Sequence, residues 1–411
     1  MVFTGFFHSL NLPSTSAPVN EISSFTYTTT SITITKTLSD ATDWSWTLNG
    51  VSQGTVAGAP GLTQVYNLPS GRFYNGDVIV VTMNSSSVTN TLSGLSTVSK
   101  TLAFLYGNFD NAYGDGNVTS ATNNGRLYAN SPTGTYSWGT LNSRSTSGSN
   151  TVYTWTPLRA LTGTKVLMIA GGGGGGRRTG GGGGAGGMVF RQNQSFSSGV
   201  QTVRVGNGGT GSTSRYAMGT RGVNSTCTGV TTAIGGGAGC CDTHQVQSTA
   251  NGGSGGGAEW NVNLFGVSTQ SSGYGNNGGS SDATRVGGAG GGGASAAGGS
   301  STSGTGFGGD GHYQVTISGT TYNFQSTFGG SYGDQISGQA WFAGGGGGGT
   351  FRGSYPTPIG GKGGGGDGGV ITSSNPTVGQ AHTGGGGGGD GRDVANGANG
   401  GSGIVLLRFS L

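Results

Sequence analysis

The chain has 411 residues, too many for one ordinary domain, and 96 of them are glycine. Only 8% of the residues are charged and the net charge is +4, with no run of lysine or arginine, which argues against a nucleic-acid-binding protein. With 9% aromatic residues the composition also differs from that of a solvated disordered chain, and no stretch approaches the length of a membrane-spanning helix.

Residues 1–22 are expected to form an N-terminal arm. They include Pro13 and Pro18, and they lack the positive start and long apolar core of a secretion signal. Residues 23–100 are expected to form a small β-sandwich, because short alternating stretches with turn residues between them follow one another. In FTYTTTSITITKTL, for example, Ile32 and Ile34 fall on one face and threonines on the other.

The stretch DWSWTLNGVSQGTV predicts a β-hairpin. Trp44 and Trp46 alternate with polar residues and are expected to face one core, while Asn49 and Gly50 supply the positive φ angles of a type I′ turn. Together with the later GDVIVVTMNSSS, this pattern resembles that of Ig-like and PKD-like modules. The resemblance implies that residues 23–100 are such a module.

Residues 101–162 contain short aromatic runs such as LAFLYGNFD, TYSWGTL and NTVYTWTPL, punctuated by Gly, Asn and Ser. They predict a second small β domain or a connector. No window of the chain has the periodicity of an amphipathic helix.

Residues 163–411 hold most of the glycines, in nearly pure runs that recur at 171–176, 180–184, 290–293, 344–349, 363–366 and 384–389. Such a run is poor in an α-helix, and it has no side chains to pair across a sheet. A flexible linker is the simplest alternative, but linkers mix glycine with serine. The ordered option is a left-handed helix with three residues per turn, whose outward N–H and C=O groups find partners on neighbouring copies. The predicted fold is therefore all-β plus bundled polyglycine type II helices.

Ordinary strands are expected to hold this bundle together. The apolar stretch 166–169 is predicted to pair with 404–407, which would close the domain from its two ends. Two further stretches, GMVFRQNQSF and VQTVRVGNGG, are predicted to form a hairpin within it.

The order of these motifs is distinctive: an apolar strand ending in AGGGGGG, then GGGGAGGMVF, VRVGNGG, AIGGGAG, NGGSGGGA and a final GANGGSGIVLLRF. It resembles the glycine-rich domain of viral appendage proteins, especially phage tail-fibre and tip adhesins, and of virion proteins of large DNA viruses. The resemblance covers residues 160–411. It implies packed polyglycine helices, loops that contact a host receptor, and an N-terminal part that docks to other virion proteins. The long insert at 312–342 departs from the family pattern.

Motifs for catalysis or cofactors are weak. PTPIGGKGG lacks the first glycine and the Ser/Thr of a phosphate-binding loop. The GGDG aspartates Asp310, Asp367 and Asp390 are predicted to bond nearby backbone N–H groups at turns, with a cation site as the alternative. The adjacent Cys240 and Cys241 do not fit a zinc site. We therefore expect no enzymatic activity, no cofactor and no metal.

The segments between glycine runs carry aromatic residues and arginines, the combination typical of recognition surfaces on stiff scaffolds. The alternative for each aromatic is that it covers an end of the bundle. The candidate receptor-binding residues are Arg177, Arg178, Arg215, Tyr216, Trp260, Phe265, Trp341, Phe342, Phe351, Arg352 and Tyr355.

The sequence thus predicts a non-enzymatic virion appendage protein, a tail fibre or tip adhesin on the virion surface, assembled in the host cytoplasm. Its expected partners are other virion proteins, a host cell-surface protein or glycan, and further copies of itself, with no nucleic acid and no membrane insertion. The alternative is a structural virion protein, such as a capsid fibre or decoration subunit. An ice-binding protein is a third class, but it would need regular tripeptide repeats, and these runs are irregular.

Overall fold

The computed structural model describes residues 21–410, except 49, 69–72, 74–76, 85, 96–98, 108, 111–133, 137–138, 158, 243–245, 263, 272, 282–286, 302–305, 330, 352–355, 372 and 392–394. The chain divides into two compact units, Met1–Val98 and Ser99–Leu411. Most of the predicted N-terminal arm lies outside the described residues.

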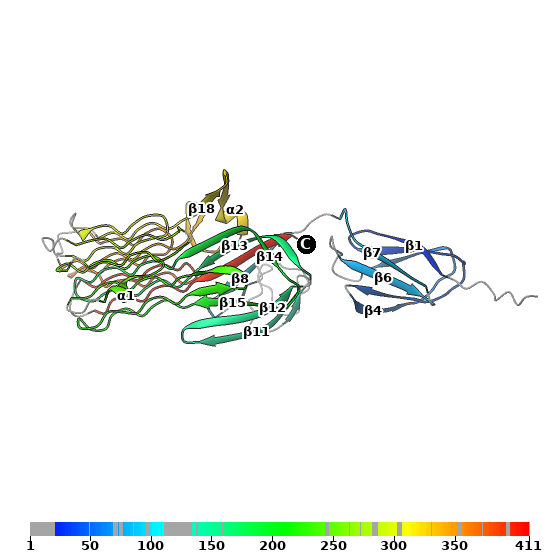
Figure 1. Ribbon diagram of the computed structural model, residues 1–411, viewed down its shortest axis with the longest axis horizontal. Coiled ribbons are helices and arrows are strands. Elements are labelled where there is room, and N and C mark those ends of the chain that lie inside the picture. Colours follow the sequence, from blue (N-terminus) through cyan, green and yellow to red (C-terminus); the bar gives the residue numbers. More distant parts are fainter. Residues whose placement is uncertain are drawn as a thin grey trace, which may run out of the picture. The chain divides into compact units, whose positions relative to one another are not determined.

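The first unit consists of two antiparallel sheets around one hydrophobic core (Figure 1). The smaller sheet has the order β1-β2-β5 and the larger has the order β4-β3-β6-β7. Their strands are β1 (Ile22–Tyr27), β2 (Ser31–Lys36), β3 (Trp44–Leu48), β4 (Val51–Val56), β5 (Thr63–Asn67), β6 (Val78–Met83) and β7 (Ser86–Thr91).

The predicted tryptophan hairpin is confirmed as the pair β3 and β4. Trp44 and Trp46 are both buried in the core that the two sheets share. Gly50 has a φ of 83°, as the turn requires, and Asn49 lies outside the described residues. The alternation of apolar and polar residues in the sequence thus correctly predicted that Trp44 and Trp46 face the core.

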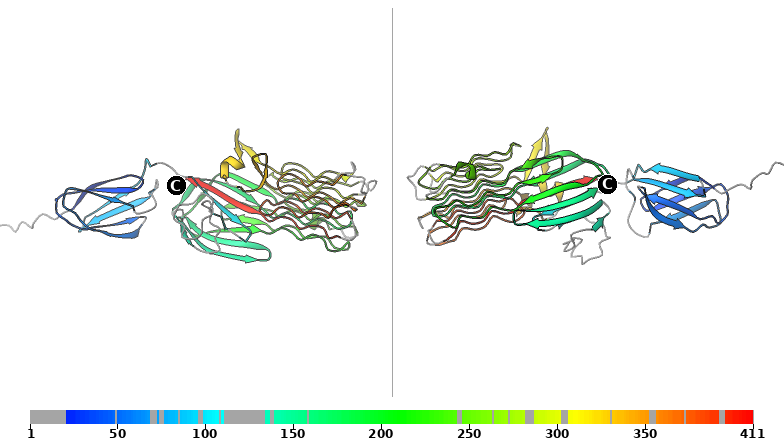
Figure 2. Two further views of the ribbon diagram at one scale, coloured as in Figure 1. Left: turned by 180° about the vertical axis from the view of Figure 1, so that it is seen from behind. Right: turned by 60° about the horizontal axis from the view of Figure 1, so that its bottom comes forward.

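The second unit is built on two larger sheets (Figure 2). One has the order β14-β13-β22-β8-β9 and the other has the order β10-β11-β12-β15-β16-β17. The strands of the first are β8 (Ser99–Leu105), β9 (Phe109–Asp110), β13 (Leu161–Ile169), β14 (Met188–Phe196) and β22 (Ile404–Ser410). Those of the second are β10 (Gly134–Tyr136), β11 (Gly139–Ser147), β12 (Asn150–Pro157), β15 (Gln201–Gly206), β16 (Ser225–Cys227) and β17 (Val230–Ala233).

Strand β13 is the centre of this unit. It pairs with β22 in antiparallel register, Val166 opposite Leu407 and Ile169 opposite Ile404, which confirms the predicted closure between the two ends of the domain. Val166 to Ile169 are all fully buried, because both faces of the sheet are covered. A strand covered on both faces has a continuous apolar sequence instead of an alternating one.

Residues 101–162 contribute to both sheets of the second unit. Strand β8 lies beside β22, and β12 pairs with β15, so this segment is joined by hydrogen bonds to the glycine-rich part instead of forming a separate module. Aromatic contacts connect the two sheets: Phe104 lies 5.3 Å from Tyr153 and 6.2 Å from Trp155 between ring centroids.

The predicted hairpin between GMVFRQNQSF and VQTVRVGNGG is wrong. Strand β14 pairs with β13. Strand β15 pairs with β12 and β16 in the other sheet. The turn residues Ser197 to Gly199 therefore carry the chain from one sheet to the other, which the sequence pattern of the two strands does not distinguish from a hairpin.

Between the strands, the glycine segments run side by side away from the sheets (Figure 1). In the run 171–176 every backbone N–H donates to another segment, over 2.8 to 3.1 Å, and the partner segment repeats every three residues. Residues 171 and 174 donate to segment 220–223, 172 and 175 to segment 398–401, and 173 and 176 to segment 181–184. The run is thus ordered by contacts with three neighbours and is no linker.

The run 180–187 is surrounded on all sides by other segments. Its N–H groups donate to the segments 384–390, 234–240 and 289–292, and its carbonyls accept from three others, 173–176, 254–257 and 346–349. A Cβ atom added to Gly182 would lie 2.0 Å from the carbonyl oxygen of Gly346. Backbone fills the space that side chains would need, which explains why these positions are glycine.

The insert at 312–342 covers one face of β13 and its neighbours. It contains β18 (Gln314–Ile317), β19 (Thr320–Asn323), α2 (Phe324–Phe328), β20 (Asp334–Ile336) and β21 (Gln339–Trp341). Phe324 and Phe328 pack 6.0 and 6.4 Å from Phe190 of β14. Both α2 and α1 (Gln247–Ala250) are about one turn long, and within the described ranges no helix has the length and apolarity to cross a membrane.

Candidate functional site

The glycine segments turn at the end of the second unit that lies away from the strands. Residues 170–176 leave β13 and 180–187 return to β14, so 177–179 form a turn at that end. Residues 213–218 form a similar turn between β15 and β16, and 259–262 follow another glycine segment. These three turns are called the distal loops below.

Tyr216 is the most exposed aromatic residue of the distal loops, with 64% of its surface accessible. Its backbone N–H donates to Ser214 Oγ over 3.1 Å, and the Arg215 guanidinium lies 5.1 Å from its ring centre. The buried Ser212 hydroxyl is 2.6 Å from the carbonyl oxygens of both Ser214 and Ala217. The turn that carries Tyr216 is therefore braced from within.

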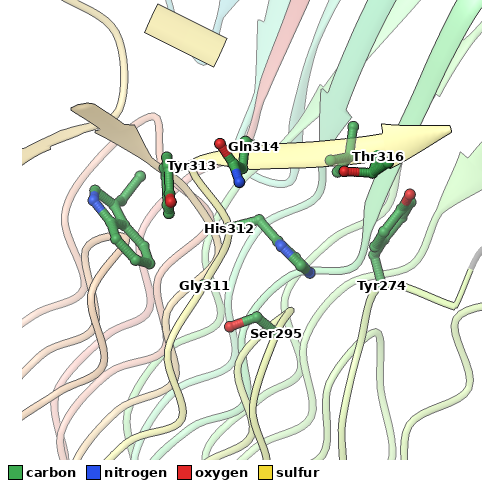
Figure 3. A pocket seen from close by; sticks show the side chains of 9 residues that line it. Tyr274, Ser295, Gly311, His312, Tyr313, Gln314 and Thr316 are labelled. Carbon is green, nitrogen blue, oxygen red and sulfur yellow. The ribbon is translucent and has the colours of Figure 1, made fainter. Parts of the chain in front are cut away.

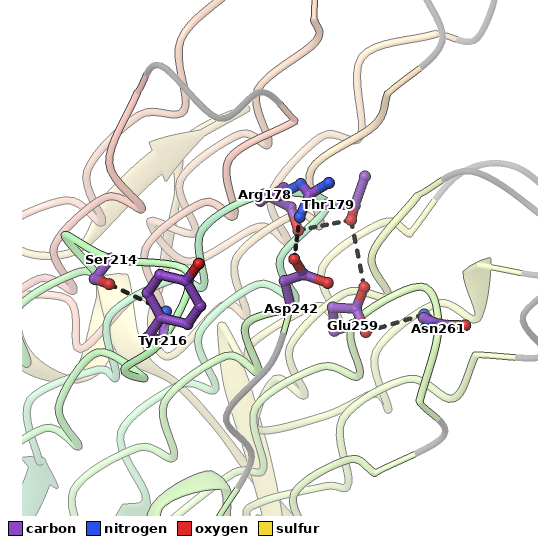
Figure 4. A network of polar contacts seen from close by, with 7 residues as sticks. All are labelled: Arg178, Thr179, Ser214, Tyr216, Asp242, Glu259 and Asn261. Carbon is purple, nitrogen blue, oxygen red and sulfur yellow. Dashed lines mark hydrogen bonds and ion pairs between the residues drawn. The ribbon is translucent and has the colours of Figure 1, made fainter.

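Two arginines tie this turn to its neighbours. Arg177 Nη1 donates to the carbonyl of Thr213 over 2.5 Å, which joins the first two distal loops. Arg178 forms an ion pair with Asp242, whose side chain is only 13% exposed (Figure 4). Both arginines were predicted as receptor contacts, and in the structure each also holds the loops in place.

Glu259, the first residue of the third distal loop, is fully buried. Its carboxylate accepts a hydrogen bond from the Asn261 backbone N–H over 3.0 Å and from the Thr179 hydroxyl over 3.4 Å (Figure 4). Burial raises the pKa of Glu259 to about 7, with a smaller contribution from the negative charge of Asp242, against the lowering effect of these hydrogen bonds. Sequence reasoning missed this residue, because one glutamate in a polar loop carries no sign of burial.

The turn 177–179 has an unusual backbone. Arg178 and Thr179 have φ angles of 58° and 51°, a region that residues other than glycine adopt rarely. In this glycine-rich segment two non-glycine residues occupy the positions where glycine would fit most easily. Their side chains make contacts that glycine could not make: Arg178 with Asp242, and the Thr179 hydroxyl with the Arg178 carbonyl at 2.6 Å and with Glu259 at 3.4 Å.

The other sequence-predicted residues fall into different environments. Trp260 is half-buried in the third distal loop, and Phe351 is 47% exposed. Phe265 borders a hollow of about 390 Å³ beside Gln247 and Val267. Arg352 and Tyr355 lie outside the described residues.

Phe342 requires a correction. Its side chain is fully buried and packs 5.9 Å from Phe324, within the core beneath the insert. It therefore covers the core and does not face a receptor. Its neighbour Trp341 points the other way, because adjacent residues of a strand alternate, and it is half-buried at the edge of a second hollow.

That second hollow, of about 350 Å³, lies beside β18, near the strand end of the glycine segments (Figure 3). Sequence reasoning missed it, since its walls come from four separate segments of the chain. It is lined by Tyr274, Ser295, Gly311, His312, Tyr313, Gln314, Val315, Thr316 and Trp341.

The cysteine, histidine and acidic residues, which are the types that often bind metals, lie in other environments. Cys227, Cys240 and Cys241 are buried and are not joined in disulfides, and burial raises the pKa of Cys240 to about 12, so its thiol stays protonated. Across the described part of the chain, no three His, Cys, Asp or Glu side chains gather as a potential metal site. Asp310 and Asp367 accept backbone N–H bonds from Lys362 and Gly360, as predicted for these two of the three GGDG aspartates.

Comparison with known families matches the glycine-rich domain to residues 145–410. The match begins within β11 and extends to the end of β22, so it includes the glycine segments, the distal loops and the insert. No curated protein matches the chain.

Proposed function

Because this chain belongs to the glycine-rich domain family, we propose that it is a non-enzymatic virion appendage protein, a tail fibre or tip adhesin, whose distal loops bind a receptor on the host surface. The observation that carries the proposal is the bracing of exposed recognition side chains. Tyr216 is exposed on a turn held by Ser212 and Arg177, so little conformational freedom is lost on binding.

We also infer that the glycine segments are polyglycine type II helices. The three-residue repeat of hydrogen-bond partners in 171–176, and the six neighbouring segments around 180–187, support this. Amide hydrogen exchange tests it. Residues 344–349 and 384–389 should exchange as slowly as the strands, and fast exchange throughout both runs would show that they are flexible.

The first unit is proposed to be an Ig-like or PKD-like sandwich that docks to other virion proteins. Two sheets around one core, with paired tryptophans in β3, support this assignment. In this scheme the protein is assembled in the host cytoplasm and exposed on the virion surface, with further copies of itself as additional partners.

Electron microscopy with gold-labelled antibodies against the chain, applied to virus particles from its source, tests the proposal. Label at the tail tip supports the adhesin, and label spread over the capsid supports the alternative of a structural fibre or decoration subunit. Purified particles without label would contradict both. Binding of the intact protein to host cells, reduced by Tyr216→Ala, then tests the distal loops directly.

A further inference from the structure

The hollow beside β18 has walls of an unusual composition. Four of its side chains are aromatic rings, namely Tyr274, His312, Tyr313 and Trp341. The rings of Tyr313 and Trp341 lie 4.6 Å apart, and those of Tyr274 and His312 lie 5.3 Å apart at nearly right angles. The hollow is therefore bordered by two preformed aromatic pairs, and His312 and Tyr313, which directly precede β18, contribute one ring to each (Figure 3).

Several polar groups at this hollow are available for a ligand. Within the described part of the chain the side-chain amide of Gln314 and the hydroxyls of Tyr274 and Tyr313 make no hydrogen bond. A ligand can therefore pair with these groups without first breaking a hydrogen bond within the protein.

The lining is also uncharged. Of the described residues that border the hollow, His312 is the only titratable one near neutral pH, and burial lowers its pKa, so its ring is neutral there. Charged groups near the hollow include Lys362, which lies over the Trp341 ring at 5.1 Å, and its ion-pair partner Asp310 at 4.0 Å. Asp334 is also close, since it lies opposite Trp341 in the pair β20 and β21. Charges of both signs are thus nearby and none lines the hollow, so an ionic ligand gains little here.

From these features we propose that the hollow binds one or two rings of a neutral saccharide, as part of a glycan chain. Ring faces pack against the C–H groups of a sugar, and amide and hydroxyl groups exchange hydrogen bonds with its hydroxyls. A volume of about 350 Å³ is near the lower limit for ligand sites, which suits a mono- or disaccharide. The site lies at the strand end, far from the distal loops, and does not depend on their proposed function.

To test this, the intact chain is titrated with the methyl glycosides of glucose, galactose, mannose and N-acetylglucosamine, and binding is monitored by ligand-observed NMR. N-acetylneuraminic acid and glucuronic acid serve as charged counterparts. We expect saturable binding of at least one methyl glycoside with a Kd on the order of 1 mM, and weaker binding of both acids. Tyr313→Ala should weaken the binding about tenfold or more, and Gln314→Ala should weaken it less.

Phe307→Ala is the matched control, because it removes a partly exposed aromatic ring that does not line the hollow and should leave sugar binding unchanged. Thermal melting of each variant verifies that it is folded, and Gln314→Ala provides a milder change should Tyr313→Ala unfold. The proposal is overturned if no methyl glycoside binds up to about 20 mM. It is also overturned if the acids bind more tightly than the methyl glycosides, if only free reducing sugars bind, or if neither pocket variant changes the binding.

Discussion

The first unit and the glycine segments of the second are both densely packed, but different atoms fill the two interiors. In the first unit, Trp44, Trp46 and Phe73 fill the space between two sheets. Among the glycine segments, the run 180–187 meets backbone on every side, and neighbours are held by N–H to C=O hydrogen bonds. The first interior depends on apolar surface removed from water, and the second on many hydrogen bonds that each contribute about 1 kcal/mol.

This difference reverses the expected response to mutation. A side-chain core is damaged most when a large residue becomes small, because a cavity remains. A backbone core is damaged most when glycine gains a side chain, because no cavity exists to receive it. Glycine also loses more conformational entropy on folding than other residues, so the bundle requires nearly all of its hydrogen bonds. Its strand end, by contrast, has an ordinary core around Leu167 and Phe190.

Gly346→Val should give the largest loss of stability. Its Cβ would lie 2.1 Å from the Gly387 carbonyl oxygen, and separation of these two segments breaks the bonds from Gly386 N–H to the Gly344 carbonyl and from Gly389 N–H to the Gly347 carbonyl. Four buried groups lose partners, which costs roughly 4 kcal/mol or more. Thermal melting measures it. Gly148→Val is the control, because a Cβ there meets nothing within 4 Å and the variant should melt like the parent.

Trp46→Ala should destabilise the first unit by about 3–4 kcal/mol, since a buried ring is replaced by a cavity. The ring packs 5.8 Å from Tyr66 and 5.9 Å from Phe73. Hydrogen exchange over 22–91 in the intact chain should accelerate, while exchange over 171–187 stays unchanged. A loss under about 1 kcal/mol would mean that the side-chain core is not what stabilises this unit.

Much of this contrast was predictable from the sequence. Alternation placed Trp44 and Trp46 on one face, and the apolar run Val166 to Ile169 indicated a strand that pairs with 404–407. Nearly pure glycine runs indicated backbone packing for steric reasons that need no structure. In each case the local pattern and the tertiary environment agree.

The candidate sites were less predictable, because their residues meet only after the glycine segments are stacked. Thr179 and Glu259 are 80 positions apart, and the hollow combines Tyr274 with Trp341. The different environments of Trp341 and Phe342 were partly predictable, since one residue of each neighbouring pair in a strand faces inward. Which of the two faces inward depends on where the strand lies over the core.

The pH dependence of the distal loops should produce a smaller effect. Glu259 has its pKa raised from 4.5 to about 7, so its contribution to stability is full below about pH 4.5 and is lost as the pH rises through 7. The loss should amount to about 1–3 kcal/mol. Thermal melts from pH 4.5 to 7.5 measure it. Glu259→Gln should remove this part of the pH dependence, and an identical profile in both proteins would show that Glu259 titrates normally.

Tyr216→Ala should have the smallest effect on stability. Its ring is 64% exposed, and the turn beneath it is held by backbone and serine groups that the substitution leaves in place. The substitution removes the packing of the ring against the Arg215 guanidinium, so the free energy of unfolding should change by less than about 0.5 kcal/mol. Phe342→Ala is the matched comparison within the same unit, and it should cost about 3 kcal/mol or more because the ring is fully buried. The free energies of unfolding of both variants, measured by denaturant titration, distinguish an exposed aromatic residue from one that stabilises the fold. If Tyr216→Ala destabilised the protein as much as Phe342→Ala, the Tyr216 ring would be part of the scaffold, and the distal loops would lose their strongest recognition candidate.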